Sequence, residues 1–448
     1  MIKDTVFQRK LISVVLPIAL QQFMLALVSA SDAVMLGAVS QDLLSAASLA
    51  GQVTFVYNLF LMAMTIGTGI FAAQYYGKGD YESVEKILAY VLRVSTGVSF
   101  LFFLAAMLAP TYLMKIFTSE AALITQGTLY LRIVGITYLL CGISQIYLCI
   151  VKNCGQAAKS MWISSATVVI NILLNAVLIF GLFGFPRLGI AGAALATTIS
   201  RVIELIWVLR ETVAMPRIKI KWKYLRHADG GLRCDFWKYT LPVLGNELVW
   251  GCGFTMYSVL MGHLGSDAVA ANSIANIVKN LTACFCLGLG SGGGIIVGNE
   301  LGAGHLKRAR QYGSSLCHLA IVSGALSGLL ILAVIPLVLR VSHLSGQSTQ
   351  YLKWMLVMCS YYMIGKSINS TTIAGIFCAG GDSRFGLKCD TITMWCFAVP
   401  LGFIVAFVFH APVLAVYFVI NLDEMVKVPA VYRHYKKYKW IKNLTKEE

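Results

Sequence analysis

The sequence predicts an all-α polytopic membrane protein with twelve transmembrane helices, arranged in two pseudo-symmetric six-helix lobes. The first observation is composition. The 448-residue chain is 58% hydrophobic and only 12% charged, whereas soluble proteins carry about 25% charged residues. The second observation is that apolar runs long enough for a spanning helix, roughly 20 residues, recur along the whole length. The alternating pattern of a transmembrane barrel is missing.

A third observation is an internal repeat with a constant offset of 225 residues, first seen at Pro17 and Pro242. Self-similarity at a fixed offset indicates duplication, so we expect both halves to share one fold. The match continues without a gap through Val34 and Val259, Gly37 and Gly262, Asp42 and Asp267, Ala46 and Ala271, Ser48 and Ser273, Gly67 and Gly292, Gly69 and Gly294, Ile70 and Ile295, Gly77 and Gly302, and Gly79 and Gly304.

The apolar runs define twelve spans, six in each half. They are expected near 14–38, 45–73, 87–109, 129–151, 160–182, 189–209, 237–262, 269–298, 313–339, 351–377, 388–409 and 412–431. A polar, basic stretch separates the halves and resembles a linker. We therefore predict an N-terminal lobe (1–209), a cytoplasmic basic linker (210–235), a C-terminal lobe (236–433) and a basic cytoplasmic tail (434–448).

Basic residues account for the net charge of +16 and lie mainly in alternate loops and at both ends of the chain. This asymmetry follows the positive-inside rule, and it places both termini in the cytoplasm of a multi-pass plasma (bacterial inner) membrane protein. The charge is therefore a topology signal near anionic lipid, and we expect no nucleic-acid partner. With six spans each, the halves form a parallel repeat about an axis along the membrane normal, an arrangement found in transporters.

Asp32 is an ionisable residue inside the first apolar run. Such a group costs roughly 2.5–3.5 kcal/mol at membrane depth, and it usually faces the bundle interior and has a function. The alternative is a hydrated position near the outer end of the helix.

Asn171 and Asn175 lie four residues apart, so both amides share one helix face. Their carbonyl oxygens are hard ligands suited to a small cation. The alternative is hydrogen bonding between helices, a common use of asparagine in membranes.

Glu247 follows Pro242, whose ring can bend the helix. A carboxyl group there would be desolvated, which favours its protonated form near neutral pH. The alternative is a salt bridge to Lys279 or Lys366, each of which interrupts an apolar run. Either lysine could instead contact substrate, and Tyr361 could line an apolar cavity.

Together these features resemble the multidrug and toxic compound extrusion (MATE) family over essentially the whole chain. The resemblance includes Leu-Pro early in the first and seventh spans, and Asp32 in Ser-Asp-Ala-Val-Met-Leu-Gly. The further motifs are Gly67-x-Gly-x4-Gln74-x2-Gly77, Asn171-x3-Asn175, the stretch from Gly189 to Thr197, the glycines from Gly292 to Gly304, and Cys-Ala-Gly-Gly-Asp382-Ser-Arg.

The resemblance implies export of organic, often cationic, compounds by antiport with Na⁺ or H⁺. It implies an N-lobe cation site at Asp32, Asn171, Asn175 and Thr197, with Na⁺ possible at the first three. Glu247 resembles the C-lobe carboxylate of the NorM-type branch, and we group it with Lys279, Lys366 and Tyr361 as cation or substrate contacts. That branch carries an acidic residue partway along span 10, where this chain has Lys366, Ser367 and Asn369.

We therefore expect a monomeric secondary antiporter for cationic or amphiphilic compounds, working by rocking of two lobes, with no cofactor beyond its coupling ion. Its partners would be small organic molecules and the lipid bilayer. The alternative is a flippase for a lipid-linked oligosaccharide or polyprenyl lipid, whose cationic cavity Lys279 and Lys366 could supply. We do not expect an enzyme such as a prenyltransferase, because the seven histidines are scattered and no Asp-rich motif is present.

Overall fold

The structure is a computed structural model that describes residues 5–214, 218, 222–226, 230–342 and 344–445. Over these residues it is helical, with no strand. Parts of the predicted linker, residues 215–217, 219–221 and 227–229, lie outside the described residues. The division into lobes at 209 and 236 stays a prediction.

The first half contains seven helices and a short 3-10 turn. They are α1 (Thr5–Val39), α2 (Gln41–Lys78), α3 (Tyr81–Leu108), α4 (Pro110–Phe117), α5 (Ala121–Asn153), α6 (Ala157–Phe180), η1 (Leu182–Gly184) and α7 (Ile190–Val213). The short α8 (Trp222–Arg226) follows.

The second half contains longer elements that change helix type within a span. They are α9 (Gly230–His263), α10 (Ser266–Gly302), α11 (Leu306–Val341), α12 (Gly346–Asn369) with η2 (Ser370–Phe377), α13 (Ser383–Asp390), η3 (Thr391–Ala398), α14 (Val399–Phe403), η4 (Ile404–Val408), α15 (Val413–Ile420) and α16 (Asp423–Tyr435). The elements η2, η3 and η4 are π-helical.

These helices confirm the twelve predicted spans. Nine helical segments of the described chain are long and apolar enough to cross a membrane on their own. The remaining three spans are α9, which carries Glu247, α12 with η2, and α15 with α16. Prolines lie inside α1 and α9, a position that membrane helices tolerate because neighbouring groups satisfy the freed backbone.

The repeat is visible in helix bounds and backbone geometry. Shifted by the 225-residue offset, α2 would cover 266–303, and α10 covers Ser266–Gly302. Gly79 and Gly304, equivalent glycines just beyond these helices, have φ of +83° and +78°. Glycine adopts this left-handed conformation without a Cβ penalty, so each half ends its second helix in the same way.

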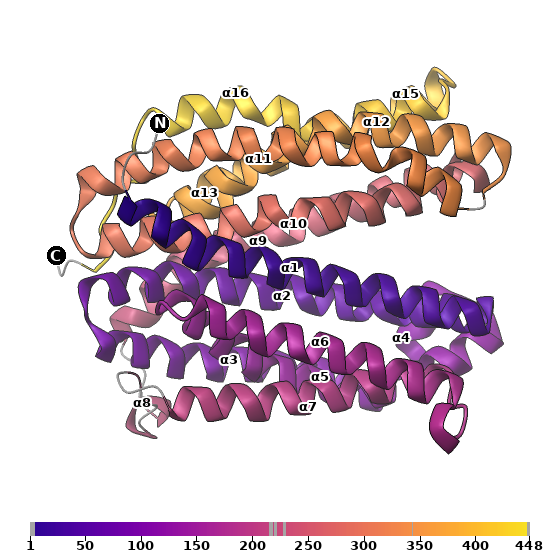
Figure 1. Cartoon of the computed structure of the whole chain (residues 1–448), viewed down its shortest axis with the longest axis horizontal. Helices are drawn as coiled ribbons and strands as arrows, with labels where there is room; N and C mark the ends of the chain where they lie inside the picture. Colours follow the sequence, from indigo (N-terminus) through magenta and orange to yellow (C-terminus); the bar gives the residue numbers. More distant parts are fainter. Residues whose placement is uncertain (1–4, 215–217, 219–221, 227–229, 343, 446–448) are drawn as a thin grey trace. The chain divides into compact units, whose positions relative to one another are not determined.

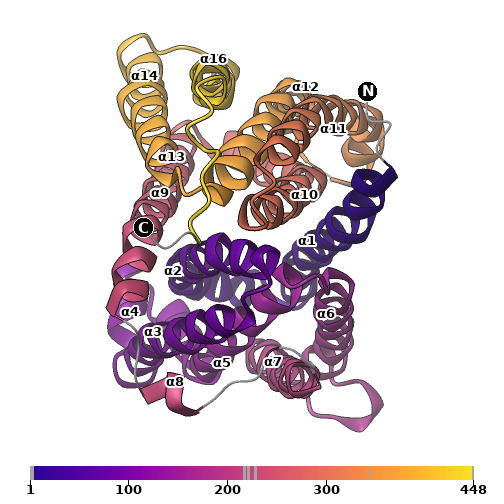
Figure 2. The same cartoon turned by 90° about the vertical axis from the view of Figure 1, so that its left-hand side faces the viewer.

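The chain divides into two compact units. One comprises Met1–Phe23, Ala73–Gly79 and Trp237–Glu448, and the other Met24–Ala72 and Asp80–Phe236. In the first unit α10, α11 and α12 pack side by side, as Figures 1 and 2 show. In the second unit α5 packs against both α3 and α7.

The described part of the tail, up to residue 445, is packed against the first unit. Trp440 is 0% exposed and its ring stacks on Tyr435 with centroids 5.6 Å apart. Gln74, at the end of α2, donates from Nε2 to the Ala379 carbonyl (2.6 Å) and accepts from the Leu444 backbone N–H (2.7 Å). The tail therefore fixes the end of α2 within this unit, in addition to carrying positive charge.

Candidate functional site

A chain of polar contacts joins α1, α6 and α7 inside the second unit. Asn175 Nδ2 donates to Asp32 Oδ1 (2.6 Å) and to Asn171 Oδ1 (3.0 Å). Asn171 Nδ2 in turn donates to Ser200 Oγ (3.2 Å) and Thr197 Oγ1 (3.4 Å). The four predicted N-lobe residues are thus adjacent, although 143 positions separate Asp32 from Asn175. Sequence reasoning did not include Ser200, which lies one helical turn beyond Thr197.

One oxygen in this cluster has no partner. Asn175 is 0% exposed, and its Oδ1 forms no hydrogen bond with any described residue. A buried acceptor without a donor costs about 1–3 kcal/mol, so such an atom in a native site calls for an explanation. The carboxylate of Asp32, Oδ1 of Asn175 and Oγ1 of Thr197 are the hard oxygen donors that a small cation requires.

A neighbouring ion pair on α7 was missed by the sequence analysis. Arg201 Nη1 lies 2.7 Å from Glu204 Oε2, and Glu204 is 1% exposed. Ser144 Oγ and Gln145 Nε2 both donate to Glu204 Oε1, at 2.7 and 3.0 Å. The signal was a basic and an acidic residue three positions apart inside the span 189–209. Arg201 and Glu204 neutralise each other. Among the described residues, Asp32 therefore has no ion-pair partner.

A second network of buried charges lies in the first unit, between α12, α13 and α16. Lys366 Nζ is 3.3 Å from Glu424 Oε1, and Asn369 Nδ2 donates to Glu424 Oε2 (2.7 Å). Lys427 Nζ is 2.7 Å from Asp390 Oδ1, 3.6 Å from Glu424 and 3.9 Å from Asp423. The pattern Asp-Glu-x-x-Lys inside span 412–431 was the signal for it. Acidic residues are therefore present in this lobe, although span 10 carries none.

The predicted C-lobe residues have different direct partners in the structure, and their role as cation or substrate contacts stays a prediction. Lys366 belongs to the charge network, so the salt bridge considered between Lys366 and Glu247 is not formed. Within the described chain, Glu247 on α9 has no ion-pair partner. Tyr361 packs its ring against Phe418, with centroids 5.9 Å apart. The ammonium of Lys279 lies 4.8 Å from the ring centroid of Tyr362, the residue next to Tyr361.

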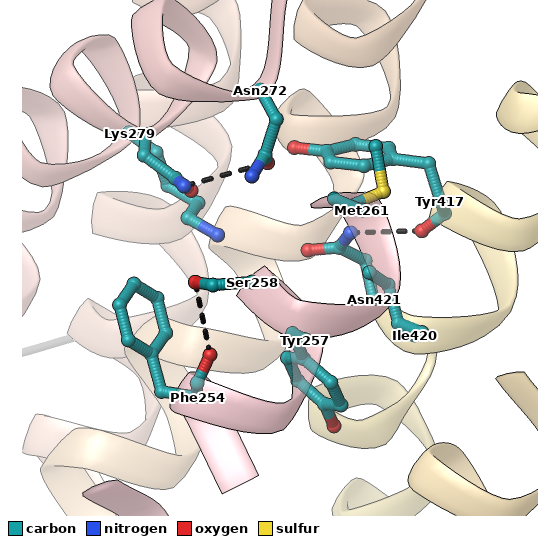
Figure 3. A pocket seen from close by; sticks show the side chains of 10 residues that line it. Phe254, Tyr257, Ser258, Met261, Asn272, Lys279, Tyr417, Ile420 and Asn421 are labelled. Atoms are coloured by element: carbon teal, nitrogen blue, oxygen red, sulfur yellow. Dashed lines mark hydrogen bonds between the residues drawn. The ribbon is translucent and has the colours of Figure 1, made fainter. Parts of the chain in front are cut away.

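Lys279 lines a pocket between α9, α10 and the end of α15, shown in Figure 3. Polar side chains dominate its wall, and three apolar ones complete it. The lining residues are Phe254, Tyr257, Ser258, Met261, Asn272, Asn276, Lys279, Tyr417, Ile420 and Asn421. In the part of the chain described, no group of three or more His, Cys, Asp or Glu side chains could hold a metal ion.

Twelve spans, an internal repeat and buried polar clusters within the spans define a polytopic α-helical membrane transporter. The MatE family model matches residues 17–177 and 242–404, once in each half. The chain therefore belongs to the MATE family of transporters.

Curated relatives agree with this assignment. The chain is 22% identical over 435 residues to the "Uncharacterized transporter YisQ" of Bacillus subtilis, covering 96% of this chain and 94% of that one. It is 27% identical over 392 residues to a "Probable multidrug resistance protein NorM" of Bradyrhizobium diazoefficiens, covering 84% of this chain and 82% of that one.

Solved structures share the fold. A MOP superfamily transporter from Pyrococcus furiosus superimposes with a TM-score of 0.88 at 15% identity, covering 97% of this chain and 96% of that chain. A multidrug resistance MATE transporter in an outward-facing conformation gives a TM-score of 0.88 at 16% identity, with the same coverage. These neighbours have the two-lobe fold, which supports the prediction of two six-helix lobes.

Proposed function

We propose that this transporter is a monomeric secondary antiporter that exports cationic or amphiphilic organic compounds in exchange for Na⁺ or H⁺. It would act in the plasma membrane with both termini in the cytoplasm, exposing its substrate site to the two sides in turn by rocking of its lobes. Membership of the MATE family and the multidrug resistance names of the relatives support this proposal. The observation that carries it is the contact between Asp32 and Asn175.

Coupling requires a group whose occupancy stabilises one conformation over another. Asp32 has this property, because it is an acid at membrane depth whose contact with α6 depends on its charge. When Asp32 is ionised, its Oδ1 accepts from Asn175 Nδ2, as in this structure. When Asp32 is protonated, rotation of the Asn175 carboxamide would present Oδ1 to the new hydroxyl. The hydrogen bond between α1 and α6 would thus reverse its direction with each proton.

Na⁺ could occupy the same place. It would be held by oxygens of Asp32, Asn171, Asn175 and Thr197. The ion would be the positive partner that the carboxylate of Asp32 lacks. Asp32 contributes the single formal charge of this set, so the ion would be held weakly and released readily. A transmembrane potential of 100 mV supplies about 2.3 kcal/mol per charge. A tenfold concentration ratio corresponds to about 1.4 kcal/mol. The movement of one charge therefore supports a substrate gradient of roughly 50-fold.

Glu247 is the second carboxylate that we propose for ion or substrate binding. It lies five positions after Pro242 on α9 and has no ion-pair partner in the described part of the chain. Lys366, one of the two lysines that could have neutralised it, is bound to Glu424 instead. We therefore expect Glu247→Gln to fold but to lose most coupled efflux.

A lipid flippase is the weaker proposal. A pyrophosphate head carries several negative charges and would require several free cations. Glu424 neutralises Lys366, and Lys279 then remains as one lysine in the C-lobe pocket. One ammonium group fits a singly charged substrate better than a pyrophosphate.

Ethidium uptake into everted membrane vesicles tests the proposed function. A Na⁺ gradient and a pH gradient are imposed in turn, with vesicles that contain Glu247→Gln as a second sample. We expect one of the two gradients to drive accumulation in wild-type vesicles, and much less accumulation with Glu247→Gln. No accumulation above empty vesicles under either gradient would contradict export of organic cations by antiport.

A further inference from the structure

The pocket of Figure 3 is built from one face of each of its helices. On α10, Asn272, Asn276 and Lys279 follow the helical spacing i, i+4, i+7, which places them on one side. Tyr257 and Met261 are likewise four residues apart on α9. The side chains leave a small recess between them, partly open to the outside. A recess with both polar and apolar walls is thus formed inside membrane-spanning helices.

Lys279 brings a positive charge to this pocket without a direct acidic partner. Among the described residues, no carboxylate lies within 4.0 Å of its ammonium group, and that group donates no hydrogen bond. The nearby acids are already used, because Glu424 and Asp423 lie beside Lys427. A lysine in a membrane helix costs roughly 2.5–3.5 kcal/mol and is usually paired, so its missing partner requires an explanation.

Further hydrogen-bond donors face the same space. Tyr257 contributes its ring to the wall, and its hydroxyl points away from the centre of the pocket. Asn421 donates from Nδ2 to the Tyr417 carbonyl (2.8 Å), which uses one of its two amide hydrogens. Figure 3 shows the ammonium of Lys279 and the carboxamides of Asn272 and Asn421 directed toward the centre of the pocket. A donor-rich pocket of this kind suits an acceptor that carries negative charge.

The internal repeat shows how the two halves of the chain differ in charge at equivalent positions. At the 225-residue offset, Tyr257 takes the place of Asp32, and Lys279 takes the place of Thr54. The first half thus presents a carboxylate at a position where the second half presents a phenol, with a lysine added nearby. A second site for a coupling cation is disfavoured here, because Lys279 would repel the ion.

We infer that the pocket between α9, α10 and α15 binds an acidic group, a single carboxylate or phosphate, of an amphiphilic substrate. The ammonium of Lys279 forms the ion pair, and the amides of Asn272 and Asn421 donate to the remaining oxygens. Phe254, Met261 and Ile420 contact the apolar part of the same molecule. This inference rests on the proposed export of amphiphilic compounds and extends its substrates to those with an acidic group.

Fluorescence anisotropy of fluorescein, a carboxylate-bearing anion, with the purified protein in nanodiscs tests the pocket. Lys279→Gln should weaken binding by about tenfold or more, because a charge-assisted hydrogen bond contributes about 1.5–3 kcal/mol and 1.4 kcal/mol is a factor of ten. Lys279→Arg should retain binding within a few-fold. Competition with phenyl phosphate and benzoate separates the phosphate and carboxylate forms of the ligand.

Lys353→Gln is the matched control, because Lys353 is an exposed lysine on α12 outside the pocket. Unchanged fluorescein affinity in Lys279→Gln, an equal loss in Lys353→Gln, or no saturable binding to the wild type would overturn the inference. Ethidium uptake into vesicles is measured in parallel for the wild type and should be unchanged in the control Lys353→Gln. Failure of ethidium transport in the wild type would instead contradict the proposed function, and the fluorescein result would still decide the pocket.

Discussion

Gly77 and Gly302 occupy equivalent positions of the repeat, and each lies against the backbone of the other's helix. A Cβ on Gly77 would overlap the carbonyl of Asn299, and a Cβ on Gly302 would overlap that of Gln74. Gln74 and Asn299 are themselves separated by the 225-residue offset. The contact is therefore pseudo-symmetric, and glycine permits it because small residues let membrane helices approach closely.

We predict that Gly77→Ala and Gly302→Ala each lower the Tm of the detergent-solubilised protein. The added methyl meets backbone atoms, which cannot rotate away, and overpacking of this kind costs about 1–3 kcal/mol. Gly51→Ala is the control on α2, because a Cβ there would meet nothing within 4 Å. Alanine is also the better helix former. An equal Tm for Gly302→Ala and Gly51→Ala would show that the two helices do not approach this closely.

Trp440 gives a second stability prediction. Its indole is 0% exposed and packs beside Gly313. A Cβ added to Gly313 would lie 2.8 Å from the indole ring. Trp440→Ala should remove about 3–5 kcal/mol and release the tail, which limited proteolysis and thermal unfolding would both detect. Trp162→Ala, at a side chain that is 66% exposed, should leave both readouts unchanged. A tail that resists protease in Trp440→Ala would mean that the hydrogen bonds to Gln74 hold it alone.

The charge network between α12 and α16 gives a third prediction. Glu424→Gln should destabilise the protein by about 3–5 kcal/mol, because Lys366 and Lys427 then keep buried charges with fewer partners. Adding Lys366→Met should recover part of that loss, which a double-mutant cycle on unfolding free energies would measure. Glu211→Gln breaks the exposed pair with Lys159 and should cost less than about 1 kcal/mol. Strict additivity of the two network substitutions would contradict the coupling between Lys366 and Glu424.

The distribution of basic loops gives a topological prediction. In a variant without the twelve native cysteines, which are all free in the structure, Lys307→Cys should react with a membrane-impermeant maleimide only from the cytoplasm. Ser266→Cys, at the opposite end of α10, should react only from outside. Both positions are exposed. Labelling of Ser266→Cys from the cytoplasmic side would refute the proposed orientation of both halves.

The sequence was sufficient for the twelve spans, because hydrophobic length and the repeat are properties of local composition. It also placed Asn171 and Asn175 on one face, since that follows from helical spacing. It did not predict the π-helical segments η2, η3 and η4. Pro400 lies between η3 and η4, but η2 contains no proline, and periodicity does not distinguish a π-helix from an α-helix.

The charged pairs were missed for a different physical reason. The prediction assigned basic residues to loops, whereas Arg201 and Lys427 lie inside spans where nearby carboxylates neutralise them. Mean hydropathy counts each charged residue separately and does not show which of them pair. A salt bridge of Glu247 to Lys279 or Lys366 was the alternative considered, but Lys366 pairs with Glu424. The tertiary packing of α12 against α16 decides which carboxylate is nearest.

The central claim is that Asp32 couples ion movement to export. Asp32→Asn keeps the shape of the side chain but can neither ionise nor take up a proton at neutral pH. We predict that it abolishes gradient-driven efflux while ethidium binding to the purified protein persists. Asp42→Asn removes an exposed acid at the start of α2 and should transport normally. Asn175→Asp adds a carboxylate beside Asp32 and should strengthen any dependence on Na⁺.

The most direct measurement is the initial rate of ethidium uptake into everted vesicles as a function of imposed Na⁺ or H⁺ gradient. It is made for the wild type, Asp32→Asn and Asp42→Asn at matched expression. We predict gradient-dependent uptake for the wild type and Asp42→Asn, and a rate for Asp32→Asn that equals that of empty vesicles at every gradient. Wild-type uptake by Asp32→Asn would contradict this prediction.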